Sequence, residues 1–169
     1  ANDLGVWLER KQFFDLQTVS LSRLRMIESV FDEHAGISVT DKSGKIKYVN
    51  DKFCSVSKYP DEELVEQDHR IINSGHHSRE FMQTLWRTIT KGKTWKGELK
   101  NRAKDDTYYW ADTTIVPFLD HTGSPYQYVA ICTEVTGYKQ LEQRMEMQVR
   151  ELARSNDELE QFAYVATHD

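Results

Sequence analysis

After Gly137 the chain contains neither glycine nor proline, and its apolar residues recur at alternating steps of four and three positions. Glycine and proline destabilise helix interiors, so their absence favours a helix. The spacing places the apolar residues in one stripe along a helix, a seam, and so predicts a long helix from residue 138 onward. A helix of about 30 residues is about 45 Å long, which exceeds a small domain. We therefore interpret the seam as a parallel coiled coil of two copies, the alternative being a helix packed on its own domain. The seam positions are Leu141, Met145, Gln148, Leu152, Ser155, Leu159, Phe162 and Ala166.

The N-terminal flank, residues 1–33, shows a noisier helical pattern. Between Gly5 and Gly36 the chain contains neither glycine nor proline, and Trp7, Phe14 and Leu21 are spaced seven positions apart. This spacing predicts a helix over about residues 4–32 whose apolar face packs against a partner or against the middle of the chain.

The middle of the chain alternates strands with short helices. Two strands joined by a Lys-Ser-Gly-Lys turn predict a hairpin, and three strands rich in aromatic and β-branched residues follow later. Between them, Ser78 is a predicted helix N-cap and Gly92 a predicted helix stop. This order favours an α+β fold, a five-stranded antiparallel sheet with short helices on one face, flanked by the two long helices. The predicted strands are 36–41, 46–50, 94–103, 107–119 and 126–136.

These patterns divide the chain into the N-terminal helical flank, a mixed domain over 34–136 and a helical segment over 137–169. The net charge of −5 argues against a nucleic-acid-binding surface, which needs clustered Lys and Arg. No apolar run reaches the roughly 20 residues of a membrane span, and no secretory signal opens the chain. The two cysteines, Cys54 and Cys132, form no CxxC pair, so neither a zinc ribbon nor a disulfide scaffold is predicted. We expect a cytoplasmic protein without a membrane segment in this chain and without a bound metal.

Five segments of the middle region together form a recognisable pattern: Ile46–Asn50, Tyr59–Leu64, Thr94–Trp110, Ile115–Phe118 and Tyr128–Ile131. These segments resemble a PAS sensor domain. The resemblance implies a PAS fold with a cavity between sheet and helices, which in this family holds flavin, haem, another small molecule or nothing known. Glu134 stands where the family usually has Asp, at the exit to a signalling helix. Asp106 replaces a usual turn glycine, and aspartate tolerates the left-handed backbone that such a turn needs.

The end of the chain resembles another family. Residues Phe162–Asp169 are similar to the start of the phosphoacceptor region of sensor histidine kinases, with His168 at the place of the phosphoacceptor. If Ala166 lies on the seam, His168 faces outward, and a neutral imidazole there is a suitable nucleophile for a γ-phosphate. The alternative is a solvated histidine with no such role. The resemblance implies an ATP-binding kinase domain and a response regulator as partners, so we expect this chain alone to be inactive.

The cofactor stays unknown from the sequence, and FAD is the first candidate. Trp95, the segment Lys100-Asn-Arg102 and the pair Tyr109-Trp110 are similar to flavin-binding PAS domains of aerotaxis receptors and nitrogen-fixation regulators. An indole stacks on an isoalloxazine ring and an amide bonds its polar edge, so Asn50, Trp95 and Asn101 are candidate flavin contacts. His69 and Arg70 are candidate partners of the ring or phosphates. The alternative is that the tryptophans only pack on the sheet.

Other pocket chemistries have weaker support. Flavin-adduct photosensors of this superfamily carry a reactive cysteine where Asp68-His69-Arg70 stands, so photoadduct formation is not expected. Haem needs an axial ligand, for which His69, His76 and His77 are the candidates. We expect the adjacent rings of His76 and His77 to be solvated in their loop.

Together these features predict the sensory and dimerisation module of a two-component sensor histidine kinase. A ligand or redox change in the pocket would be relayed through a homodimeric coiled coil to His168. The alternatives are a PAS module that only dimerises or docks, and a PAS sensor coupled to another output.

Overall fold

The structure is a computed structural model that describes residues 33–168 of the 169-residue chain, with the side chains described up to Tyr164. The chain divides after Glu134 into two units, a sheet domain and a C-terminal helix. Each unit is described by itself. The helix predicted over residues 4–32 lies outside the described residues.

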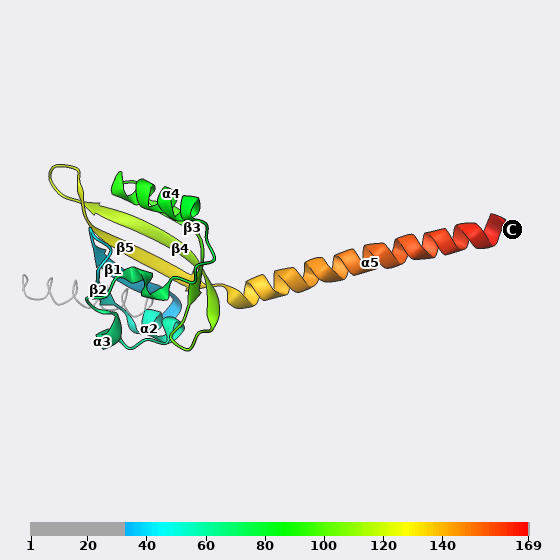
Figure 1. The fold of residues 1–169 in the computed structure, drawn as a ribbon, viewed down its shortest axis with the longest axis horizontal. Coiled ribbons are helices and arrows are strands. Elements are labelled where there is room, and N and C mark those ends of the chain that lie inside the picture. The colour runs from blue at the N-terminus through cyan, green and yellow to red at the C-terminus, as the bar shows by residue number, and fades with distance from the viewer. Residues whose placement is uncertain (1–32, 169) are drawn as a thin grey trace, which may run out of the picture. The chain divides into compact units, whose positions relative to one another are not determined.

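The sheet domain contains five antiparallel strands in the order β2-β1-β5-β4-β3 (Figure 1). The predicted five-stranded antiparallel sheet is therefore confirmed. Strand β1 pairs with both β2 and β5, so the hairpin of β1 and β2 joins the rest of the sheet through β5. The strands are β1 (Gly36–Asp41), β2 (Ile46–Val49), β3 (Trp95–Arg102), β4 (Tyr108–Leu119) and β5 (Pro125–Glu134).

Short helices connect β2 to β3 and cover one face of the sheet, as predicted. The longest, α4, begins where expected, because the hydroxyl of Ser78 accepts a hydrogen bond from the backbone N–H of Phe81 at 3.2 Å. Gly92 follows its end with a φ of 73°, a left-handed conformation that favours glycine. The helices are α2 (Asp51–Ser57), α3 (Asp61–Leu64), the 3₁₀ helix η1 (His69–Ile72) and α4 (Arg79–Thr90).

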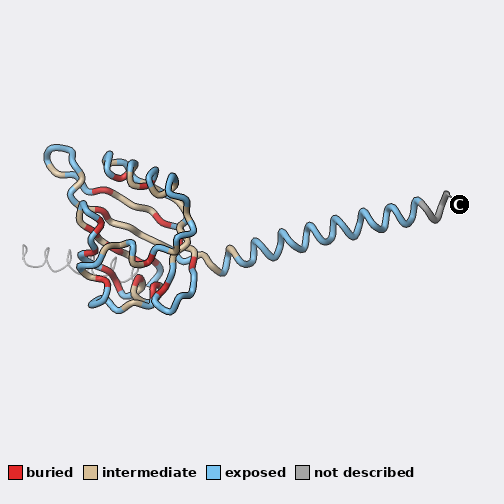
Figure 2. Tube along the Cα trace, viewed as in Figure 1, coloured by how far each residue is buried: buried red, intermediate tan, exposed pale blue. Residues whose placement is uncertain are grey.

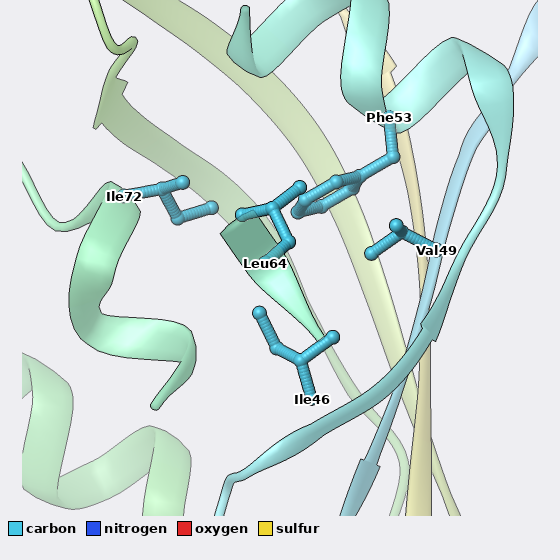
Figure 3. Close-up of a cluster of buried hydrophobic side chains, with 5 residues drawn as sticks. All are labelled: Ile46, Val49, Phe53, Leu64 and Ile72. Carbon is cyan, nitrogen blue, oxygen red and sulfur yellow. The ribbon is translucent and has the colours of Figure 1, made fainter. Parts of the chain in front are cut away.

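The buried apolar residues form three clusters. One joins β2 to the first three helices, and its side chains point toward one another in Figure 3. It consists of Ile46, Val49, Phe53, Leu64 and Ile72. The second joins α4 to β5 through Leu85, Ile89 and Tyr128. The third consists of Ala103, Tyr109 and Ala111.

The C-terminal helix α5 (Thr136–His168) has 33 residues and confirms the long helix predicted there. Only Val135 separates it from β5. It is exposed from residue 140 to 164, apolar side chains included (Figure 2). In the described part of the chain, no helix combines the length and the hydropathy that a membrane span requires.

Candidate functional site

A cavity of about 100 Å³ lies between the inner face of the sheet and the helices. Its floor carries hydroxyl groups, because alternate residues of β1 and β4 point inward: Ser38, Thr40 and Thr113 are all buried. Its roof is apolar and comes from α4, where Leu85 and Trp86 lie on the face toward the sheet. The cavity therefore offers an apolar slot with hydrogen-bonding groups on one wall, which is the usual chemistry of a small-molecule site.

The ring of His69 projects into this cavity from η1. Its Nε2 lies 3.0 Å from Oγ of Ser38, and its centroid is 5.8 Å from that of Phe53. Burial lowers the pKa of His69 to about 4, and the nearby Asp68 carboxylate opposes that shift only in part. The imidazole is therefore neutral near pH 7 and takes part in hydrogen bonding without carrying charge.

Asn101 also lines the cavity, from the edge strand β3. Its side chain forms a hydrogen bond with the buried Tyr109, whose pKa is raised by burial. Asn101 also pairs with Asn73, which precedes α4 in a loop that runs along the edge of β3. The structure thus brings His69 and Asn101 to the same cavity, together with a third predicted contact, Arg70.

Arg70 is a cavity-lining residue, but its guanidinium is occupied at the surface. It donates two hydrogen bonds to the Asp68 carboxylate, at 2.9 Å from Nε and 2.7 Å from Nη2. Its side chain is 76% exposed. The charge of Arg70 is therefore directed toward Asp68 and solvent.

The two remaining flavin candidates lie outside the cavity lining. The side chain of Asn50 caps α2 by accepting from the backbone N–H of Phe53 at 3.0 Å, and it accepts from Ile37 at 2.7 Å. The indole of Trp95 meets Phe81 edge to face at 5.9 Å between centroids and lies across Gly97, which has no Cβ in its way. Both side chains are thus placed where they join secondary-structure elements together.

His77 was a candidate only as a haem ligand, and the expectation that its ring is solvated is wrong. The ring lines the cavity and accepts a hydrogen bond from the backbone N–H of Lys100 at 2.8 Å. It also stacks on Phe81, with centroids 4.4 Å apart. The sequence signal was the spacing of four between His77 and Phe81, which continues the apolar face of α4 backward into the loop. His76 is exposed, as expected.

The cavity agrees with a flavin in lining chemistry but not in size. Pockets for drug-sized ligands measure roughly 300 to 1,000 Å³, whereas this cavity measures only about 100 Å³. Trp95, the expected stacking partner, is not part of its lining. The side chains as they stand therefore do not fit an isoalloxazine ring or the larger haem. Within residues 33–168, no three His, Cys, Asp or Glu side chains are grouped as metal ligands.

Comparisons with known proteins agree with this architecture. The PAS domain family matches residues 34–137. The nitrogen fixation regulatory protein of Klebsiella pneumoniae is 34% identical over 109 residues, 64% of this chain and 22% of that protein. The aerotaxis receptor of Escherichia coli strain K12 is 32% identical over 105 residues, 62% of this chain and 21% of that protein. The chain thus spans about a fifth of the length of these relatives.

A solved structure gives the same fold. The PAS domain of a protein from Colwellia psychrerythraea superposes with a TM-score of 0.60 at 20% identity, covering 68% of this chain and 98% of that one. The family match covers more than half of the present chain and includes all five strands and the helices between them. The chain therefore belongs to the PAS family, and its sheet domain is a sensor and signal-transduction domain of that family.

Proposed function

We propose that this chain is the sensory and dimerisation module of a sensor histidine kinase, which relays a change in the PAS cavity along α5 to His168. The observation that carries the proposal is the path of the chain. Strand β5 contributes Tyr128 to the cavity, and only Val135 separates that strand from the 33-residue helix that ends at His168. A shift of β5 is therefore transmitted directly into the start of α5.

The cavity acts on this path through differential binding. A ligand changes the balance between two conformations only by as much as its affinity differs between them. Tyr128 contacts the roof of the cavity, because its ring meets Trp86 edge to face at 6.1 Å. A small ligand that pushes these two rings apart favours one position of β5 over another. The ligand class that suits the site is a small, largely apolar molecule with a group that bonds His69 or a floor hydroxyl.

The partner of α5 in this proposal is a second copy of the chain. The helix exposes Leu152 and Phe162 at 73% and 75%, and both lie on the heptad seam. A second, parallel helix that packs on these positions removes their apolar side chains from water and so stabilises the dimer. We expect Leu152→Glu to shift the protein toward monomer in sedimentation analysis. Met147→Glu is the matched control, because Met147 is exposed on the same helix but lies off the seam.

The kinase assignment is tested in the longer protein that it requires, in which an ATP-binding domain follows residue 169. With radiolabelled ATP, His168→Gln abolishes phosphate incorporation if His168 is the acceptor. The matched control is His121→Gln, an exposed histidine in the turn between β4 and β5. Full incorporation in the His168 variant would refute the assignment.

A second candidate is a PAS module that only dimerises or docks. The small size of the cavity favours it, because about 100 Å³ leaves little room for a ligand. This candidate keeps the α5 dimer but predicts that no small molecule co-purifies with the protein and that none changes its output. Heating the purified protein releases any bound small molecule into the supernatant. Mass spectrometry of that supernatant therefore distinguishes the two candidates.

A further inference from the structure

The loop before α4 closes the free edge of the sheet. Strand β3 is an edge strand, and the backbone of Lys100 faces away from β4. Its N–H donates to Nε2 of His77 at 2.8 Å, and its carbonyl accepts from the hydroxyl of Ser74. The loop therefore satisfies both polar groups of this edge residue with side chains, next to the single β-bridge between Asn73 and Asn101.

This geometry fixes the protonation state of His77. A backbone N–H can only donate, so Nε2 must carry a lone pair and the ring proton must be on Nδ1. The ring is held in place between Phe81, stacked at 4.4 Å, and Trp110, which it meets at 6.0 Å between centroids. The hydrogen bond to Lys100 thus exists only while the imidazole is neutral.

The surroundings of His77 favour that neutral state. Partial burial lowers its pKa, and the neighbouring His76 lowers it further. The groups that face the ring from α4 and β4, Phe81 and Trp110, carry no charge. From β3, the ammonium of Lys100 lies 5.8 Å from the Trp110 ring centroid, and no carboxylate contributes to the shift.

We propose that His77 is an acid-sensitive latch that holds the loop over residues 73–77 against β3 and so closes one side of the cavity. Protonation places an N–H on Nε2, so that two donors face each other and the bond to Lys100 is lost. Because His77 lines the cavity, loss of this bond loosens the His77 end of the loop and opens that part of the wall to solvent, whereas Ser74 and the Asn73–Asn101 bridge still hold the other end. This latch goes beyond the proposed function and does not depend on the kinase output, because it involves the sheet domain alone.

The test is NMR on the whole chain, with hydrogen exchange of the Lys100 amide corrected for its intrinsic rate. The reference is the Leu99 amide, which points toward β4 because successive residues of a strand alternate in direction. Between about pH 7.5 and about pH 4.5, protection of Lys100 relative to Leu99 falls by about tenfold, the loss expected for one hydrogen bond. The range extends below that of an ordinary histidine because the pKa of His77 is lowered. Nitrogen-15 shifts of the His77 ring must change over the same pH range, from the Nδ1–H tautomer to the imidazolium.

Variants separate the latch from a general effect of acid. His77→Gln keeps a neutral acceptor, so the Lys100 amide stays protected at both pH values. His77→Phe keeps the stacking on Phe81 but has no acceptor, so the same amide is unprotected at both. His76→Gln is the matched control and keeps the pH dependence. The latch is refuted if His77 carries its proton on Nε2 at about pH 7.5, if it stays neutral down to about pH 4.5, or if its protonation leaves Lys100 protected.

Discussion

The buried ring of His69 makes the stability of the sheet domain depend on pH. In the unfolded chain this histidine titrates near pH 6.5, whereas burial lowers its pKa to about 4 in the folded state. The folded state thus binds fewer protons than the unfolded chain between these values, so stability falls as the pH falls through this window. At 1.36 kcal/mol per pKa unit, the difference corresponds to about 3 kcal/mol, fully present above about pH 6.5 and lost by about pH 4.

The assay is urea unfolding of the chain at a fixed concentration, at four or five pH values between about 7.5 and 4.5. His69→Gln keeps a hydrogen-bonding group near Ser38, whose hydroxyl lies 3.0 Å from the imidazole, but it does not titrate. The free energy of unfolding of this variant therefore falls less steeply with acid than that of the parent. The difference between the free energies of unfolding of the parent and of this variant therefore changes by up to about 3 kcal/mol over this pH range, at no more than about 1.4 kcal/mol per pH unit.

Other titrating groups are present in both proteins and cancel in the difference. His121→Gln, a substitution of an exposed histidine, is the matched control and gives a curve parallel to that of the parent. A difference between the parent and His69→Gln that stays constant from about pH 7.5 to about pH 4.5 would refute the reasoning. So would an NMR titration in which the folded-state pKa of His69 is near 6.5.

Three further substitutions test the packing by urea unfolding. Asn50→Ala removes the cap of α2 and leaves the Ile37 N–H without its acceptor, which we expect to cost about 3 kcal/mol. Gly97→Ala places a Cβ 2.7 Å from the Trp95 ring, which we expect to cost about 1–3 kcal/mol, whereas Gly137→Ala, with open space around it, costs nothing measurable. Asp106→Gly relieves a left-handed φ of 64° and stabilises the fold by up to about 1 kcal/mol, since only an exposed ion pair at 3.7 Å is lost. An unchanged Asn50 or Gly97 variant, or a destabilised Asp106 variant, would contradict these assignments.

The local elements of this protein were predictable because short-range chemistry determines them. The helix after Ser78 begins there because a hydroxyl satisfies a backbone N–H three residues later, and that relation is visible in the sequence. The left-handed backbone at Asp106 was likewise expected from the turn that it occupies. The long C-terminal helix followed from heptad spacing and the lack of glycine and proline.

The cavity was predictable only in part, because its lining comes from distant parts of the chain. The resemblance to flavin-binding PAS domains, together with residue type, pointed to His69, Arg70 and Asn101, and the structure brings all three to the cavity. The same reasoning selected Asn50 and Trp95, whose side chains instead join α2 to β1 and α4 to the sheet. An amide or an indole has the same chemistry in either setting, so its type alone does not distinguish a ligand contact from a packing contact.

The sequence by itself determined the five strands, the helix after Ser78 and the long C-terminal helix, since caps, turns and hydrophobic periodicity act over a few residues. Only the tertiary structure decided the strand order, which puts β1 between β2 and β5 and joins residues about 90 positions apart. The same folding turned His77 from an expected surface residue into a cavity wall, because it laid the loop before α4 along the edge of β3. Which side chains meet depends on how the elements pack, and packing is a property of the whole domain.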